Sequence, residues 1–148
     1  MQDRFQKFTL IITEINRAIN KIKSEEMARF NLKGTHVSCL YYLYINGTLT
    51  AKELTDICQE DKAAVSRSLD YLEKNGYIYC DSKAQKRYKS PLKLTEKGYE
   101  VGSAMSDIIT DIVKEANSEL SQWDLITMYQ GLYSINEKLQ NLCSKYEK

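Results

Sequence analysis

The sequence is poor in the residues that build catalytic sites. Its 148 residues include one histidine, one proline and one tryptophan. With a single imidazole, acid–base catalysis has few groups to use. The sequence shows no glycine-rich phosphate-binding loop and no nucleophile paired with a base. These absences predict a protein that is not an enzyme and that carries no cofactor.

Cysteine and histidine are too dispersed to suggest a metal site. Zinc binding needs thiolates and imidazoles at set spacings. The four cysteines Cys39, Cys58, Cys80 and Cys143 are scattered, and only His36 could join them. We therefore predict no metal site and no disulfide framework, and we expect most of the thiols to act as small buried apolar groups.

Long apolar runs are also missing. No segment reaches the roughly 20 apolar residues of a membrane-spanning helix. The charged residues Asp3, Arg4, Lys7 and Glu14 interrupt the N-terminal segment, which is not the pattern of a signal peptide. The sequence thus predicts a cytoplasmic protein with no membrane partner.

Acidic and basic residues are balanced in number but not in position. The net charge is +1, yet residues 62–97 contain nine Lys or Arg and four Asp or Glu, a net charge of +5, whereas residues 98–148 carry −4. This asymmetry favours a face that binds nucleic acid. The alternative is that the basic segment is an ordinary solvated loop.

Apolar residues recur every three or four positions near both ends of the chain, a spacing typical of helices that pack on other helices. The stripes are Phe5, Phe8, Ile12, Ile15, Ile19 and Ile22, and then Leu125, Met128, Leu132, Ile135, Leu139, Leu142 and Tyr146. We predict that residues 1–34 and 100–148 supply helices that pair two copies into a homodimer. The alternative is a monomer in which both stripes fold back into one core.

Between these ends, the sequence predicts two short helices joined by a turn. Thr50 followed by Glu53 is a capping-box pattern, which opens a helix with Leu54 and Ile57 on its inner side. A second helix is predicted over residues 62–75. Together they form a helix-turn-helix.

The second of these helices has one apolar and one polar face. It follows the N-cap residue Asp61 and buries Val65, Leu69 and Leu72, so that the outer face carries Lys62, Ala63, Ser66 and Arg67. Such a face fits the major groove, where an arginine can bind guanine with two hydrogen bonds worth about 1–3 kcal/mol of discrimination. A lysine at the helix N-terminus favours a phosphate. These four residues are predicted to bind double-stranded DNA.

A hairpin with a basic loop is predicted next. Residues 77–80 and 91–94 alternate in the manner of strands and flank a loop, 81–90, that contains Lys83, Lys86, Arg87 and Lys89. Arginine and lysine side chains are favoured in narrow minor grooves. We expect these four residues to bind DNA as a wing.

The run ELTDICQEDKAAVSRSLDYLEKNGYI, followed by the basic loop and by LTEKG, resembles the MarR family of bacterial winged-helix transcription regulators. The resemblance implies a homodimer that binds a pseudo-palindromic operator, usually as a repressor. It places Ser66 and Arg67 on the recognition helix and Arg87 on the wing. Family wings commonly carry Asp-x-Arg where this sequence has Lys86-Arg87-Tyr88, so the aspartate is absent.

The resemblance also implies a signal that releases the DNA. The first helix contains no cysteine of the kind that peroxide-sensing relatives use, which leaves a small organic effector in a cleft beside the DNA-binding lobe. Asn16, Arg17, His36, Cys39 and Tyr42 are the candidate contacts. The alternative is that the aromatic residues here belong to the core.

The sequence therefore predicts a mainly α fold with a small β-hairpin wing: a winged helix-turn-helix with N- and C-terminal dimerisation helices. We expect one domain over residues 1–148, with a DNA-binding lobe over 35–98 and the wing at 77–94. The predicted function is that of a ligand-responsive homodimeric repressor. The alternative is a winged-helix protein-interaction module that no longer binds DNA.

Overall fold

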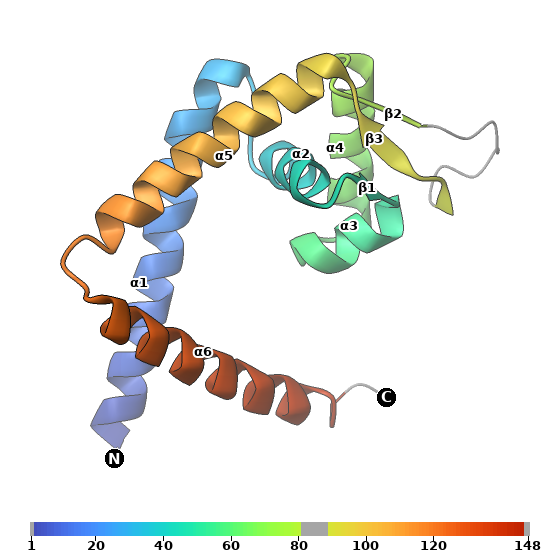
Figure 1. Cartoon of the computed structure of the whole chain (residues 1–148). Helices are drawn as coiled ribbons and strands as arrows, with labels where there is room; N and C mark the ends of the chain where they lie inside the picture. Colours follow the sequence, from blue (N-terminus) through green and yellow to red (C-terminus); the bar gives the residue numbers. More distant parts are fainter. Residues whose placement is uncertain (1, 81–88, 147–148) are drawn as a thin grey trace. The chain divides into compact units, whose positions relative to one another are not determined.

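The computed structural model describes residues 2–80 and 89–146 and divides the chain into two compact units, residues 1–108 and 109–148. Figure 1 shows the elements in chain order. They are the helices α1 (Gln2–Met27), α2 (Thr35–Asn46), α3 (Ala51–Cys58), α4 (Lys62–Lys74), α5 (Glu96–Ala116) and α6 (Gln122–Cys143), the 3-10 turn η1 (Ala28–Phe30), and the strands β1 (Thr48–Leu49), β2 (Ile78–Cys80) and β3 (Leu92–Leu94).

A break in the helical conformation follows the first helix. Helix α1 passes into η1, and Asn31 then takes the left-handed conformation with φ +57°, where its backbone N–H donates to the carbonyl of Ala28. Gly34, with φ +45°, precedes α2. Positive φ is costly for most residues and natural for glycine and asparagine. The chain therefore reverses here before α2 begins.

The helix-turn-helix is also confirmed. The N–H of Glu53 donates to Thr50 Oγ1 at 3.2 Å, and the Glu53 carboxylate accepts from the Thr50 N–H at 2.7 Å, so both halves of the capping box are present. The Thr50 N–H and the Thr50 hydroxyl both donate to the Glu53 carboxylate and lower the pKa of Glu53. Leu54 is buried, but Ile57 is 37% exposed. The inward position predicted for Ile57 is wrong, because the helix ends one residue later and its last turn lies at the edge of the core.

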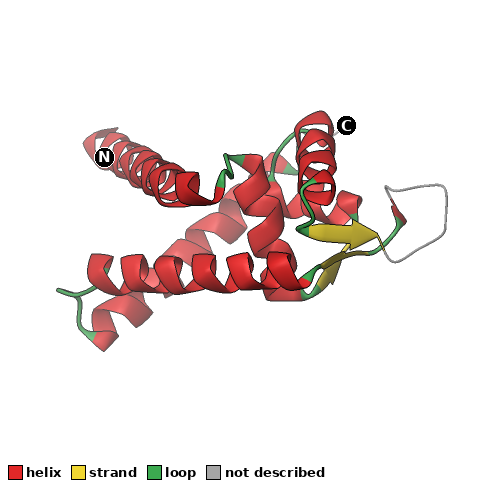
Figure 2. Cartoon of the chain, turned by 90° about the horizontal axis from the view of Figure 1, so that it is seen from above, coloured by secondary structure: helices red, strands yellow, loops and turns green. Residues whose placement is uncertain are grey.

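The sheet differs from the predicted hairpin by one strand. Strands β2 and β3 pair antiparallel with Tyr79 opposite Lys93. The short β1 pairs with the other edge of β3, Thr48 opposite Lys93, which gives the order β1-β3-β2. In Figure 2 the strands lie at the edge of the helical lobe. Pro91 precedes β3, where its missing N–H breaks no ladder bond.

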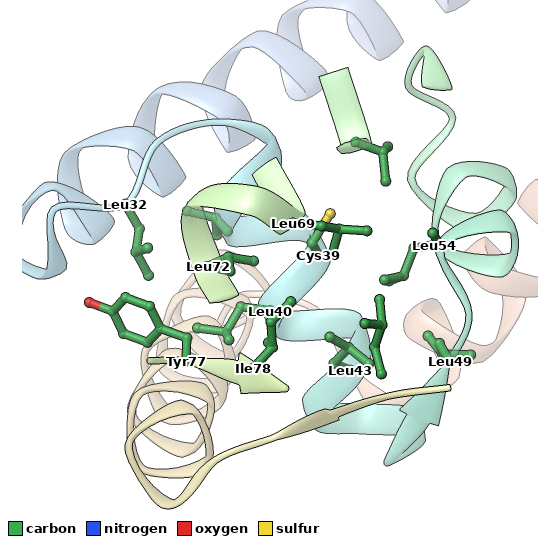
Figure 3. Close-up of a cluster of buried hydrophobic side chains, with 14 of the residues drawn as sticks. Leu32, Cys39, Leu40, Leu43, Leu49, Leu54, Leu69, Leu72, Tyr77 and Ile78 are labelled. Atoms are coloured by element: carbon green, nitrogen blue, oxygen red, sulfur yellow. The ribbon is translucent and has the colours of Figure 1, made fainter. Parts of the chain in front are cut away.

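The core of the first unit forms where α2, α3, α4 and the sheet meet. Leu40 and Leu43 from α2 pack with Leu69 and Leu72 from α4, and all four are at most 1% exposed (Figure 3). Met27, at the end of α1, belongs to the same cluster. Each fully buried side chain of this size contributes roughly 1.5–3 kcal/mol, so this core fixes α4 firmly.

The terminal helices form as predicted but keep their apolar stripes exposed. On α1, Ile12, Ile15, Ile19 and Ile22 are between 39% and 54% exposed. On α6, a capping box joins Ser121 and Asp124, and no residue of that helix is buried. The corresponding stripe, Met128, Leu132, Ile135, Leu139 and Leu142, is 37–50% exposed. Large apolar surfaces of this kind usually mark an interface.

Candidate nucleic-acid interface

Helix α4 is held by its buried side. Val65, Leu69 and Leu72 are at most 1% exposed, and Ser68 between them is 4% exposed. The helix therefore cannot rotate about its axis without exposing core leucines to water. This fixed rotation determines which side chains α4 presents outward.

The outward face of α4 carries the four residues predicted to bind DNA. Lys62, Ala63, Ser66 and Arg67 are all exposed. They occupy the first two turns, and the N-terminal part of a recognition helix is the part that reaches base edges. The sequence-based placement of these residues on one exposed face is confirmed, whereas DNA contact by them stays a prediction.

The start of α4 is set by Asp61. Its Oδ1 accepts from the Ala64 N–H at 2.9 Å, and its backbone is extended, with φ −69° and ψ 150°. Gln59, two residues before it, takes a left-handed conformation with φ +52°, which makes the turn between α3 and α4. The remaining backbone N–H groups of this first turn favour an anion beside Lys62.

The LTEKG segment fixes the other end of α4. Lys97 Nζ donates to the carbonyl of Asn75 at 2.8 Å and lies 4.2 Å from the Tyr77 ring centre. The Thr95 hydroxyl accepts from the Gly98 N–H at 3.1 Å and donates to the Gly76 carbonyl. These contacts tie the end of α4, the start of β2 and the start of α5 to one another.

The described residues cover only part of the predicted wing. Strands β2 and β3 are described, and Lys89, just before β3, is exposed. Lys83, Lys86 and Arg87 lie outside the described residues, so their predicted contact with DNA stays a prediction.

A cavity of about 600 Å³ is lined by the end of α1, the segment that follows it, the start of α2 and one residue of α4. The ring of His36 stacks on that of Tyr71, with centres 4.2 Å apart and planes 3° apart. The Tyr71 hydroxyl donates to the Asn31 carbonyl at 2.9 Å. The lining residues are Ser24, Ala28, Asn31, Leu32, Lys33, His36 and Tyr71. Tyr71 belongs to α4, so a side chain of α4 forms part of the cavity wall.

His36 is the one of the five predicted effector contacts that lines this cavity. Burial lowers the pKa of His36, and the charge of Lys33 lowers it further. Cys39 is fully buried in the core, and Tyr42 packs against the same cluster. Asn16 and Arg17 are exposed on α1. The five residues therefore do not gather around this cavity.

The sequence and the structure both match known regulators. A family model for the MarR family matches residues 30–87. An HTH-type transcriptional regulator of Bacillus subtilis (strain 168), YwoH, is 33% identical over 95 residues, which cover 61% of this chain and 69% of YwoH. The chain belongs to the MarR family. The matched range, 30–87, contains α2, α3 and α4.

Solved structures of MarR-family proteins share this fold. Staphylococcus aureus MarR in complex with salicylate and kanamycin has a TM-score of 0.83 at 18% identity, covering 92% of each chain. Streptococcus pneumoniae FabT in complex with DNA has a TM-score of 0.78 at 20% identity, covering 93% of this chain and 99% of FabT. The predicted winged helix-turn-helix is thus confirmed, and the protein is a MarR-family transcriptional regulator.

Within the described residues of this MarR-family protein, no group of three His, Cys, Asp or Glu side chains could hold a metal ion. Among the described helices, none has the length and apolar character that a membrane-spanning helix requires.

Sequence reasoning missed two features near the site. Strand β1 has two residues, too few to show a period. The stack of His36 on Tyr71 joins α2 to α4. This contact depends on how the helices pack. The single histidine was the available signal in the sequence, and it did not indicate a partner.

Proposed function

We propose that this MarR-family regulator is a homodimeric repressor that binds a pseudo-palindromic operator in the cytoplasm. In this proposal α4 enters the major groove, and the loop over 81–90 reaches the minor groove. Residues 35–98 act as the DNA-binding lobe, while 1–34 and 100–148 supply the dimerisation helices of a single functional domain.

The observation that carries the proposal is the outward face of α4. Lys62, Ala63, Ser66 and Arg67 are exposed together on a helix whose rotation the core fixes. Arginine is suited to guanine, serine to a base edge or phosphate, and alanine to a thymine methyl. The FabT structure in complex with DNA supports this use of the fold.

The exposed apolar stripes of α1 and α6 support a dimer. Monomeric proteins seldom leave such stripes in water, and helix-turn-helix regulators commonly match a two-fold protein to a palindromic site. Two α4 helices about 34 Å apart would enter successive major grooves on one side of the duplex.

We also propose that the cavity beside His36 and Tyr71 receives a small organic effector. Its volume of about 600 Å³ suits a small molecule. A ligand in this cavity would contact Tyr71, which belongs to α4. It would therefore favour one orientation of α4 over another. Salicylate, which is bound in the S. aureus MarR structure, is a suitable first probe.

The effector proposal is tested by calorimetric titration of salicylate. We expect saturable binding that Lys33→Ala weakens, since Lys33 lines the cavity with an exposed cation. Lys21→Ala removes a cation from α1 outside the cavity lining and serves as the control. Equal weakening by both substitutions would place the ligand elsewhere.

The DNA proposal is tested with the purified protein and the DNA upstream of its own coding sequence. We expect log affinity to fall with log salt at a slope of about −0.9 per phosphate contacted, and we expect tighter binding to this DNA than to a scrambled duplex. Absence of binding at low salt would instead favour a winged-helix protein-interaction module.

A further inference from the structure

Two tyrosine hydroxyls from the end of α4 bind two consecutive backbone carbonyls in the turn that follows α1. The Tyr71 hydroxyl donates to the carbonyl of Asn31 at 2.9 Å, and the Tyr77 hydroxyl donates to the carbonyl of Phe30 at 3.3 Å. The donors lie 40 and 47 residues from their acceptors in the chain. We call these two bonds the tyrosine clamp. Two bonds to neighbouring groups restrict orientation as well as distance.

The carbonyls can accept these bonds because the helix has ended. The turn η1 closes at Phe30, and Asn31 takes its left-handed conformation directly afterwards. Carbonyl groups in the last turn of a helix lack donors from their own helix and take hydrogen bonds from elsewhere. The two phenols supply such donors at the α1–α2 junction, residues 28–34.

The way in which α4 ends determines where the two phenols lie. Gly76 follows the helix with φ +75°. Its N–H donates to the Glu73 carbonyl at 3.1 Å, and the Tyr77 N–H donates to the Leu72 carbonyl at 2.8 Å. This pair of bonds is the Schellman motif of helix ends. Tyr77 therefore keeps a set position relative to the last turn of α4, which carries Tyr71.

Each tyrosine ring is also held on one face. His36 stacks on the Tyr71 ring with centres 4.2 Å apart, and the ammonium of Lys97 lies 4.2 Å from the centre of the Tyr77 ring. Tyr77 is 7% exposed and belongs to the buried cluster that includes Leu32 (Figure 3). A buried phenol usually places its hydroxyl on a hydrogen-bond partner. Both rings are thus fixed while their hydroxyls reach the junction.

The junction determines the direction in which α1 leaves the lobe that carries α4. Among the side chains of α1 that the structure describes, Met27 alone is buried. The helix has 26 residues, which give a length of about 39 Å at 1.5 Å per residue. A tilt of about 5° at the junction would move its far end by about 3 Å, close to the roughly 3.4 Å between successive base pairs. A small change of angle here is therefore large on the scale of DNA.

We propose that Tyr71 and Tyr77 are positioning residues for DNA binding, which hold the α1–α2 junction against the end of α4 and so set the spacing of the two α4 helices in the dimer. The spacing part rests on the proposed function, because it needs a DNA-binding homodimer that α1 helps to assemble. The hold on the junction does not. If the hydroxyls only stabilised the lobe, their removal would lower stability without changing which half-site spacing the dimer prefers.

The hold on the junction is tested by limited trypsin digestion of the folded full-length chain, followed by mass spectrometry. Arg29 and Lys33 lie exposed in the junction, and cleavage after them requires local opening. The cleavage rate follows the population of the open form when reclosing is fast. We expect Tyr71→Phe and Tyr77→Phe each to speed cleavage at both sites by about two- to tenfold, the change that loss of one neutral hydrogen bond gives.

Tyr99→Phe is the matched control, because it removes the same atom from a tyrosine of α5 that is 60% exposed. It should leave cleavage after Arg29 and Lys33 at the wild-type rate. Circular dichroism melts check that every variant is folded. Wild-type cleavage rates in both clamp variants, or equal acceleration in the control, would overturn the hold on the junction.

The positioning role is tested with duplexes of different half-site spacing. Footprinting of the wild type on its own upstream DNA locates the two half-sites, and duplexes are then made with one base pair added or removed between them. We expect the wild type to bind the native spacing most tightly. The protein with both Tyr71→Phe and Tyr77→Phe should lose about three- to tenfold of that preference, and Tyr99→Phe should keep it. If the double variant does not fold, the single variants give the same comparison.

An affinity that falls by the same factor at every spacing would show a merely structural role for the two hydroxyls and would overturn the positioning role. Indifference of the wild type to spacing would overturn it as well. If the wild type binds its upstream DNA at no spacing, the proposed function fails, and the trypsin rates still decide whether the tyrosines hold the junction.

Discussion

At the scale of single residues, His36 is an unusual group in this protein because it is the only histidine and stacks on a residue of α4. Its Nδ1 accepts from the Lys33 backbone N–H at 3.4 Å. Burial and then Lys33 lower its pKa. The folded protein therefore favours the neutral ring.

This pKa shift predicts a pH dependence of stability. The unfolded imidazole, with a pKa of about 6.5, takes up a proton before the folded one, so the contribution of His36 is complete above that pH. It is lost as the pH falls through the lowered pKa of the folded state. We expect the melting temperature to fall between about pH 7.5 and 5.5, and to fall less in His36→Gln. Thermal melts by circular dichroism give the comparison; identical pH profiles would contradict it.

At the scale of elements, the joint between β2 and α5 depends on a glycine. A Cβ at Gly98 would overlap the carbonyl oxygen of Tyr77, which also accepts the Thr95 N–H at 3.0 Å. The helix start therefore approaches the strand more closely than any other residue type allows. This explains in physical terms why the LTEKG segment ends in glycine.

Substitution of Gly98 by alanine should force the start of α5 away from β2. We expect the free energy of unfolding to fall by about 1–3 kcal/mol, the usual range for overpacking. Gly131→Ala is the matched control: nothing lies within 4 Å of its added Cβ, and alanine favours a helix interior over glycine by roughly 0.5–1 kcal/mol. Urea denaturation measures both. A Gly98→Ala protein as stable as the wild type would contradict the close packing of the start of α5 against Tyr77.

The elements also show what the sequence could predict. The capping box of Thr50 and Glu53, the cap at Asp61 and the stripe of α4 are local patterns, and all three are confirmed. Strand β1 was not predicted because its partner, β3, lies more than 40 residues away. Ile57 was predicted to be buried because it lies three residues after Leu54, on the same side of the helix. This spacing does not show where the core ends.

The candidate site shows the same difference between features that follow from local sequence patterns and contacts that depend on tertiary packing. Exposure of Ser66 and Arg67 follows from the helical period, and it is confirmed. Contact of His36 with Tyr71 depends on how α2 packs against α4. A single sequence carries no signal for such pairs.

At the scale of the whole molecule, the exposed stripes should control assembly. Ile15 is 49% exposed on the α1 stripe. In the proposed dimer Ile15→Glu would bury a charge at the interface, which is strongly unfavourable. We expect sedimentation to show a shift from dimer to monomer at micromolar concentration. Thr13→Glu adds the same charge on the opposite side of α1 and should leave the dimer intact. A wild-type protein that sediments as a monomer would contradict the dimer directly.

In the proposed function the outward face of α4 binds bases, and the variant Arg67→Ala removes the side chain suited to guanine. Its affinity for the upstream duplex and for a scrambled duplex should be measured at one salt concentration beside the wild type and Arg4→Ala, which removes the same charge from an exposed position at the start of α1. We expect Arg67→Ala to lose about 1–3 kcal/mol of preference for the upstream duplex, while Arg4→Ala keeps the wild-type preference. An undiminished preference in Arg67→Ala would contradict base recognition by α4.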